Sequence, residues 1–135
     1  MTDSSQDRSR QDRFSHSALL DAMPDAVVIV DSEGRVVGFN AMAEGMFGYD
    51  RTEVLGQSIE LLMPDQFRDT HVEERRRYAE APHVRPMGAE RHLLARHKNG
   101  REFAVEISLA PYQTPEGALV VGAIRAVKGR GATSD

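Results

Sequence analysis

The fold is decided by the stretch from residue 34 to residue 56, which reads GRVVGFNAMAEGMFGYDRTEVLG. It starts with turn chemistry, continues as a short β-branched strand and then changes to helical spacing. Asn40 is placed to N-cap a short helix that Gly48 ends. Asp50 and Glu53 have the spacing of a capping box for the next helical turn. A strand followed by two capped helices predicts a domain of mixed α and β structure.

Strand patterns lie on both sides of this stretch. Residues 26–30 are a short apolar, mostly β-branched run, and the turn before residue 35 makes them a hairpin with residues 35–39. Asn99-Gly100 predicts a second hairpin with a type I′ turn. The later strands are predicted at residues 90–97, at 103–109 with alternating burial, and at 118–127. The order predicts an α+β fold: a five-stranded antiparallel sheet with helices gathered on one face.

The longest helix is predicted from Asp65 to Ala81, directly after a proline. Most of its side chains are charged. Phe67, His71 and Tyr78 fall on one face, which we expect to point inward. The three arginines at 75–77 are balanced by nearby glutamates, which predicts a solvated helix face and no phosphate-binding surface.

The chain of 135 residues has the length of one domain. Residues 1–13 are polar and charged, and we expect a flexible N-terminal tail. A helix is predicted from Phe14 to the proline at position 24, and the folded domain from 14 to 127. The polar, glycine-rich residues 128–135 are predicted to be a C-terminal tail or linker.

Composition excludes several classes of function. The net charge of −4 argues against a nucleic-acid partner. The lack of cysteine excludes disulfides, thiolate zinc sites and covalent flavin–cysteine photochemistry, and fits a cytoplasmic location. No apolar run is long enough to cross a membrane, and no signal peptide is recognisable. No nucleophile, phosphate-binding or kinase motif occurs, so we expect a sensor or binding module and not an enzyme.

Several short segments follow one another in a recognisable order: Met23-Pro24-Asp25-Ala26, Asn40-Ala41-Met42-Ala43-Glu44, Phe47-Gly48-Tyr49, Asp50-Arg51-Thr52-Glu53-Val54-Leu55-Gly56 and Lys98-Asn99-Gly100. With these segments the chain resembles the PAS family over roughly residues 14–127. The resemblance implies a PAS module that binds heme, a flavin or a small metabolite, dimerises, and drives a histidine kinase, a cyclase or another output domain. One feature departs from the family: Ile124-Arg125-Ala126-Val127-Lys128 lacks the aspartate of the usual signal-transmitting tripeptide.

Within that family the chain is most similar to the heme-binding oxygen sensors of the FixL and Dos types. His71 lies eight residues after Met63 of a Met-Pro pair, which matches their iron-ligating histidine. Arg91, nine residues before Gly100, matches the arginine that hydrogen bonds to bound oxygen. The resemblance therefore implies heme b, with His71 as the metal ligand and a diatomic gas such as O2 as the signal.

Further positions complete the candidate site. Arg77 and His83 resemble residues that approach the heme propionates, and Ile107 and Leu109 match aliphatic residues on the oxygen side. Met87 is a candidate sixth ligand, although packing explains it better. The cofactor-binding set implied is His71, Arg77, Tyr78, His83, Arg91, Ile107 and Leu109.

Two other interpretations remain open. The module can bind a flavin or a small metabolite instead of heme. It can also bind no ligand and act in homodimerisation through its N-terminal helix, whose apolar residues are Phe14, Leu19, Leu20 and Met23. The aliphatic strand positions are then ordinary core, and His71 is a hydrogen-bonded interior residue.

Overall fold

The computed structural model describes residues 18–87 and 93–127. Residues 18–22 are helical. The elements that follow are β1 (Ala26–Val30), β2 (Val36–Phe39), α2 (Ala41–Phe47), α3 (Arg51–Val54), the 3-10 turns η1 (Ile59–Leu62) and η2 (Asp65–Phe67), α4 (Arg68–Glu80), β3 (Leu93–Arg96), β4 (Glu102–Thr114) and β5 (Gly117–Ala126).

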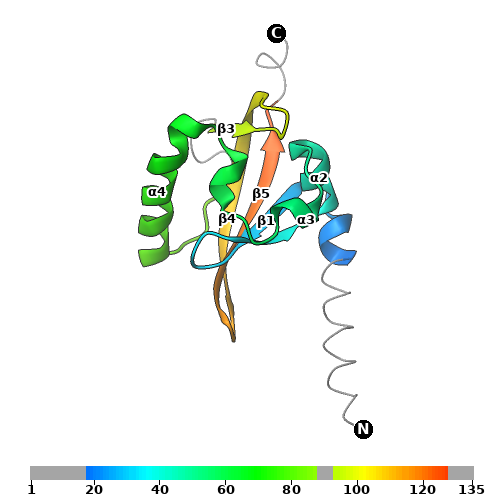
Figure 1. Cartoon of the computed structure of the whole chain (residues 1–135). Coiled ribbons are helices and arrows are strands. Elements are labelled where there is room, and N and C mark those ends of the chain that lie inside the picture. Colours follow the sequence, from blue (N-terminus) through cyan, green and yellow to red (C-terminus); the bar gives the residue numbers. More distant parts are fainter. Residues whose placement is uncertain (1–17, 88–92, 128–135) are drawn as a thin grey trace.

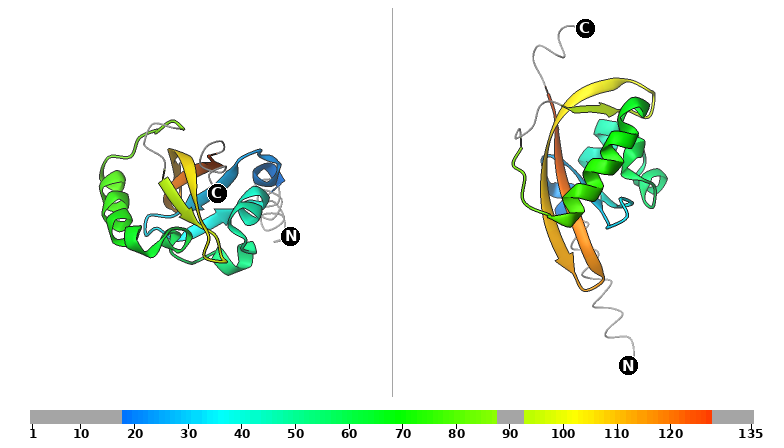
Figure 2. Two further views of the ribbon diagram at one scale, coloured as in Figure 1. Left: turned by 90° about the horizontal axis from the view of Figure 1, so that it is seen from above. Right: turned by 90° about the vertical axis from the view of Figure 1, so that its left-hand side faces the viewer.

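The five strands form one antiparallel sheet in the order β2-β1-β5-β4-β3. The first strand therefore pairs with the last one at the centre of the sheet, and β2 and β3 are the two edge strands. The helices cover one face of this curved sheet (Figures 1 and 2). The predicted α+β architecture is confirmed.

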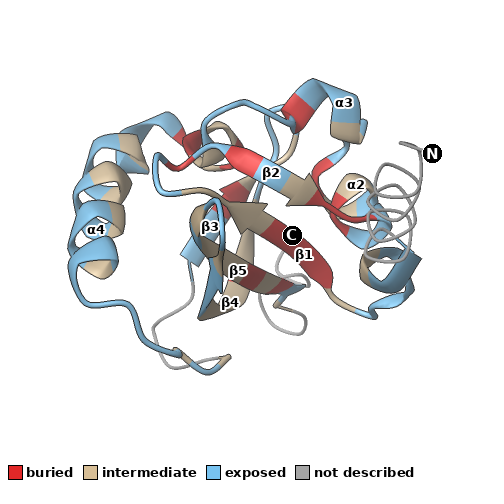
Figure 3. Cartoon of the chain, turned by 90° about the horizontal axis from the view of Figure 1, so that it is seen from below, coloured by how far each residue is buried: buried red, intermediate tan, exposed pale blue. Residues whose placement is uncertain are grey.

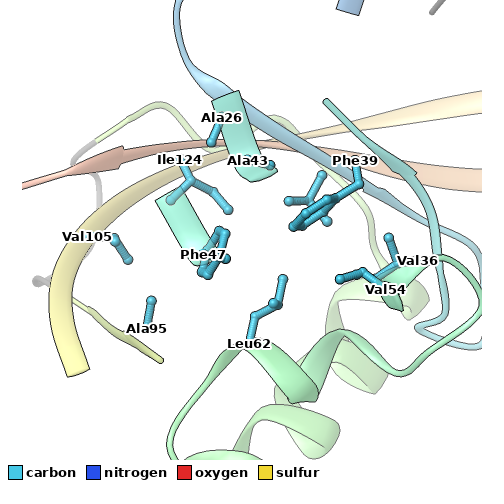
Figure 4. Packing of buried hydrophobic residues seen from close by; sticks show 11 residues of the cluster. Ala26, Val36, Phe39, Ala43, Phe47, Val54, Leu62, Ala95, Val105 and Ile124 are labelled. Atoms are coloured by element: carbon cyan, nitrogen blue, oxygen red, sulfur yellow. The ribbon is translucent and has the colours of Figure 1, made fainter. Parts of the chain in front are cut away.

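The core lies between that face and helices α2 and α3 (Figure 4). Phe47 of α2 is 1% exposed and stands between two other aromatic rings, with ring centroids 6.1 Å from Phe39 and 5.8 Å from Phe103. The strand register places alternate residues on this face, among them Val28, Phe39, Val105 and Ile124. Apolar burial thus concentrates at the α2 and α3 side of the molecule.

The predicted helix caps are confirmed. The Asn40 side chain accepts a hydrogen bond from the Ala43 amide at 3.0 Å, and Gly48 ends α2 in a left-handed conformation. Asp50 and Glu53 form the reciprocal capping box of α3. Local sequence signals at these positions were sufficient because a cap satisfies amides within three residues of itself.

The long helix is shorter than predicted. Residues 65–67 form the separate 3-10 turn η2, since the Arg68 amide bonds to the Asp65 carbonyl, and α4 begins only at Arg68. Phe67 is consequently out of phase with the α4 repeat and is 42% exposed, so the prediction that it points inward is wrong.

The predicted second hairpin is confirmed, but the prediction of a type I′ turn is wrong. Among non-glycine residues of the described chain none has a positive φ, so Asn99 does not adopt the type I′ conformation. Gly100 has φ +94°, its amide bonds to the His97 carbonyl, and the His97 amide bonds to Arg101. These bonds make a turn with a single left-handed residue, as in hairpins of odd loop length. Of the strand predicted at 90–97, residues 93–96 are observed and 90–92 lie outside the described residues.

Candidate cofactor-binding site

Helix α4 is rich in charged residues, and none of its residues is buried. It stands at one end of the helical layer, away from α2 and α3 (Figure 3). Asp69 in its first turn and Arg77 in its last complement the helix dipole. One face is half-buried and consists of Arg68, His71, Val72, Arg75 and Tyr78. Polar contacts of this face therefore dock α4 on the domain.

The principal contact is with Glu60 of η1, a carboxylate whose side chain is only 7% exposed. Its Oε2 accepts from Nδ1 of His71 at 2.6 Å and from Nε of Arg75 at 3.0 Å. Its Oε1 accepts from Nη2 of Arg75 at 3.2 Å and from Oγ of Ser58 at 2.5 Å. Both oxygens are satisfied, and a two-point pairing with arginine is the strong form of such a contact.

The electrostatics of Glu60 follow from these partners. Burial alone would raise its pKa, but the hydrogen bonds from Arg75, Ser58 and His71 outweigh burial and lower the pKa of Glu60 to about 2. An ionised carboxylate only accepts hydrogen bonds, so Nδ1 of His71 carries the hydrogen. In the neutral ring the lone pair then lies on Nε2. Within the described chain no hydrogen bond engages that second nitrogen.

The same network reaches the first hairpin of the sheet. The Gly34 carbonyl accepts from the amide of Ile59 at 2.8 Å. The guanidinium of Arg75 packs on Gly34 so closely that a Cβ built there would lie 2.3 Å from Cζ. Gly34 also has φ +80°, which disfavours any other residue. The expectation that residues 75–77 are a solvated face is therefore wrong for Arg75, because its charge compensates a buried carboxylate.

The predicted site residues of the sheet lie on the helix-facing side of β4. Ile107 is half-buried, pairs with Ile124 and packs against the core cluster. Leu109 is also half-buried, and its backbone forms an isolated bridge to Arg85 in the segment after α4. His71 has a side chain 31% exposed. The imidazole of His71 and the two aliphatic side chains are thus all partly exposed.

Tyr78 and His83 contact each other at the C-terminal end of α4. The Tyr78 hydroxyl donates to the His83 carbonyl, and the ring centroids are 5.3 Å apart. Nδ1 of His83 donates to the Ala81 carbonyl at 3.0 Å, and the residue is exposed. Arg77 is exposed as well. The roles implied for these three side chains toward a cofactor stay predictions.

Arg91 and Met87 are the two remaining candidates for the site. Arg91 lies outside the described residues. Met87 is half-buried in the segment before that gap. Among the residues that the structure describes, no group of three histidine or acidic side chains is arranged to hold a metal ion.

No helix within 18–87 or 93–127 is both long and apolar enough to cross a bilayer.

Sequence reasoning missed Glu60 and underrated Arg75. A signal existed for each: Glu60 is the one charged residue in the run Ile59-Glu60-Leu61-Leu62, and Arg75 follows His71 by four residues, on the same helix face. A carboxylate inside an apolar turn is buried only when it has partners. These signals indicate that Glu60 needs a partner and that His71 and Arg75 share a helix face, but they do not show that Glu60 meets that face.

Proteins similar in sequence include two sensor proteins and a histidine kinase. The chain is 28% identical over 110 residues to the sensor protein FixL of Bradyrhizobium diazoefficiens. The aligned stretch covers 80% of this chain and 21% of FixL. The chain is 32% identical over 83 residues to the oxygen sensor protein DosP of Escherichia coli, covering 62% of this chain and 10% of DosP. A Brucella cell-division control histidine kinase, PdhS, is 41% identical over 44 residues, 33% of this chain and 4% of the kinase. The chain thus spans a small part of these relatives.

These relatives define a sensory domain of signal-transduction proteins. Residues 16–127 match the family model described as the PAS fold, so the chain belongs to the PAS family.

Solved structures agree on the fold. The PAS domain of an HTR-like protein from Haloarcula marismortui has a TM-score of 0.68 at 22% identity, covering 90% of this chain and 97% of that one. A LOV protein of Rhodobacter sphaeroides has a TM-score of 0.71 at 19% identity, covering 91% of this chain and 71% of that one. At these identities the likeness establishes the architecture alone.

Proposed function

We propose that this chain is the oxygen-sensing PAS domain of a larger signalling protein, and that it binds heme b through the imidazole of His71. The observation that carries the proposal is the state of that ring. Glu60 engages Nδ1 at 2.6 Å, which leaves Nε2 as a donor atom on a half-buried side chain. A neutral imidazole of this kind is a common axial ligand of heme iron.

The donor set fits a heme group. Histidines that bind metals usually donate their second ring N–H to a carboxylate or a carbonyl, and His71 has such a partner. When bound, heme iron supplies a coordination position for a diatomic gas. Ile107 and Leu109, on the helix-facing side of β4, would keep water from that position. The similarity to FixL and DosP supports the same function.

The polar residues of the set have separate roles in this proposal. Arg77 in the last turn of α4 and His83 just after the helix are exposed, and we assign both to the heme propionates. Tyr78 holds the backbone of His83 through its hydroxyl. Arg91 is assigned to the bound gas, because a permanently charged guanidinium stabilises partial negative charge on oxygen.

The output is proposed to lie outside this chain. The relatives of which it spans 21%, 10% and 4% include sensor proteins and a histidine kinase, so a kinase or cyclase domain is the proposed partner in a cytoplasmic protein. The domain itself is proposed to be non-catalytic. Homodimerisation through the N-terminal helix is proposed because Leu19 is 63% exposed and Met23 39%. A Leu19→Glu variant that elutes as a dimer, like the parent chain, would contradict this interface.

The absorption spectrum tests the proposal. We expect the purified chain, or the chain titrated with hemin, to show a Soret band, and His71→Gln to lose it. Glutamine can still donate to Glu60, so this variant keeps the network and separates ligation from folding. His97→Gln is the matched control, because His97 is half-buried too but lies in the β3–β4 turn.

The other interpretations give different results. A yellow protein that retains a flavin after purification would assign the site to flavin. A colourless chain that binds no added hemin would favour the interpretation that the domain binds no ligand and acts in dimerisation. A Soret band that persists in His71→Gln would remove His71 as the ligand.

A further inference from the structure

We propose that Glu60 and Arg75 are positioning residues for the iron-binding ring: the carboxylate holds the His71 proton on Nδ1 and strengthens donation from Nε2, while Arg75 balances its charge. This inference rests on the proposed heme function. It assigns a role to two residues that do not themselves touch the cofactor.

The first step is the orientation of the ring. Glu60 offers only acceptor atoms to the imidazole, and its Oε2 lies 2.6 Å from Nδ1. A neutral histidine has one N–H, so this contact selects the tautomer with the hydrogen on Nδ1. It also fixes the rotation of the ring about the side chain. Both effects leave Nε2 as the donor atom before any cofactor arrives.

The second step is charge balance. Glu60 is 7% exposed, and a buried negative charge requires a partner. Arg75 supplies it through two nitrogens at 3.0 and 3.2 Å. With that positive charge present, the buried carboxylate is paired with a permanent cation. Arg75 follows His71 by one helical turn, so both donors reach the same carboxylate from one face of α4.

The third step is rigidity. Ser58 donates to Glu60 at 2.5 Å, and Gly34 leaves the space that the guanidinium fills. The carboxylate is therefore fixed by hydrogen bonds from Ser58 and from Arg75 of α4, and Arg75 is itself packed against Gly34 of the first hairpin. An acceptor held in this way keeps its hydrogen bond when Nε2 binds a metal, and an N–H bonded to a carboxylate makes the opposite nitrogen a stronger donor.

The first measurement uses the domain without heme, so that the tautomer of His71 is tested independently of cofactor binding. In long-range ¹H–¹⁵N spectra of neutral histidine, we expect His71 of the parent chain to carry its hydrogen on Nδ1. Glu60→Gln should lose this single tautomer, because an amide can either accept from or donate to Nδ1. Glu73→Gln, an exposed carboxylate of α4 that pairs with Arg76 at 3.4 Å, is the matched control and should not change the spectrum. An unchanged His71 tautomer in Glu60→Gln would overturn the proposal.

The second measurement uses added hemin. We expect Glu60→Gln to weaken hemin binding by about 10–100-fold, the usual effect of losing the hydrogen-bond partner of a metal ligand, and to raise the heme reduction potential. Glu60→Asp should restore part of both. Should Glu60→Gln not fold, Arg75→Gln replaces it: weaker hemin binding with the Nδ1 proton retained supports the assignment, and binding equal to the parent chain removes Arg75 from it.

Failure of the proposed function gives a different result. A parent chain that takes up no hemin refutes the heme proposal and the role of Glu60 toward iron, whatever the apo spectra show. Hemin binding by the parent chain with equal affinity and potential in Glu60→Gln refutes only the positioning role.

Discussion

Replacing Glu60 by glutamine should destabilise the domain at neutral pH, and this loss of stability should shrink as the solution is made acidic. Glu60 is buried in η1 and accepts from Ser58, His71 and Arg75. Glutamine keeps the shape and one acceptor oxygen but removes the charge. The two cationic or polar partners from α4 then face a neutral amide, and the docking of that helix weakens.

The magnitude follows from the pKa of Glu60, which folding lowers from 4.5 to about 2. Each tenfold change in proton affinity corresponds to about 1.4 kcal/mol, so the ionised carboxylate adds roughly 3 kcal/mol to the free energy of unfolding. The folded-state pKa is the lower one. This contribution is therefore complete above the unfolded-state pKa near 4.5 and decreases as the pH falls toward 2.

Urea denaturation of the parent chain and of Glu60→Gln at several pH values between 7 and about 2.5 measures this effect. We expect the difference in unfolding free energy to be roughly 3 kcal/mol at neutral pH and to shrink steadily below pH 4.5. Taking the difference cancels the contributions of the other carboxylates. Glu73→Gln serves as the control with an exposed carboxylate on the same side of the fold. A difference that is the same at pH 7 and at pH 3 would refute the reasoning.

Three further predictions concern stability and can be checked by thermal or urea denaturation. Gly34→Ala should destabilise the domain by at least about 1 kcal/mol, because the residue has φ +80° and its Cβ would displace Arg75; Gly45→Ala, whose Cβ meets nothing within 4 Å, should be neutral or stabilising. Phe47→Ala should cost about 3–5 kcal/mol by emptying the centre of the core, and a loss below about 1 kcal/mol would mean that the core can close over the gap. Asn40→Ala should cost about 2 kcal/mol, since the amide caps α2, accepts from Val27 at 2.8 Å and donates to two carbonyls; Asn40→Asp, which keeps the acceptor alone, should recover only part of that stability.

Part of the candidate site was predictable and part was not. His71 was placed on the inward face of a helix from periodicity, and the structure leaves it half-buried on that face. Ile107 and Leu109 were assigned to the buried side of a strand, and their strand register confirms that side. Whether these residues bind a cofactor stays a prediction. The periodicity of α4 also indicated which of its side chains share a face, but it contained no information on the group that faces them.

Local signals in the sequence determined the order of the elements, the caps of α2 and α3, the two hairpins and the face of each strand that is buried. Each of these depends on residues a few positions apart, so short-range propensity and hydrogen bonding were sufficient. Only the tertiary structure decided that Glu60 meets His71 and Arg75, which are 11 and 15 residues further along the chain, and that Arg75 packs on Gly34 of the first hairpin. Those contacts depend on how η1 closes against α4, and a buried charge selects its partners from whatever the folded chain brings within hydrogen-bonding distance.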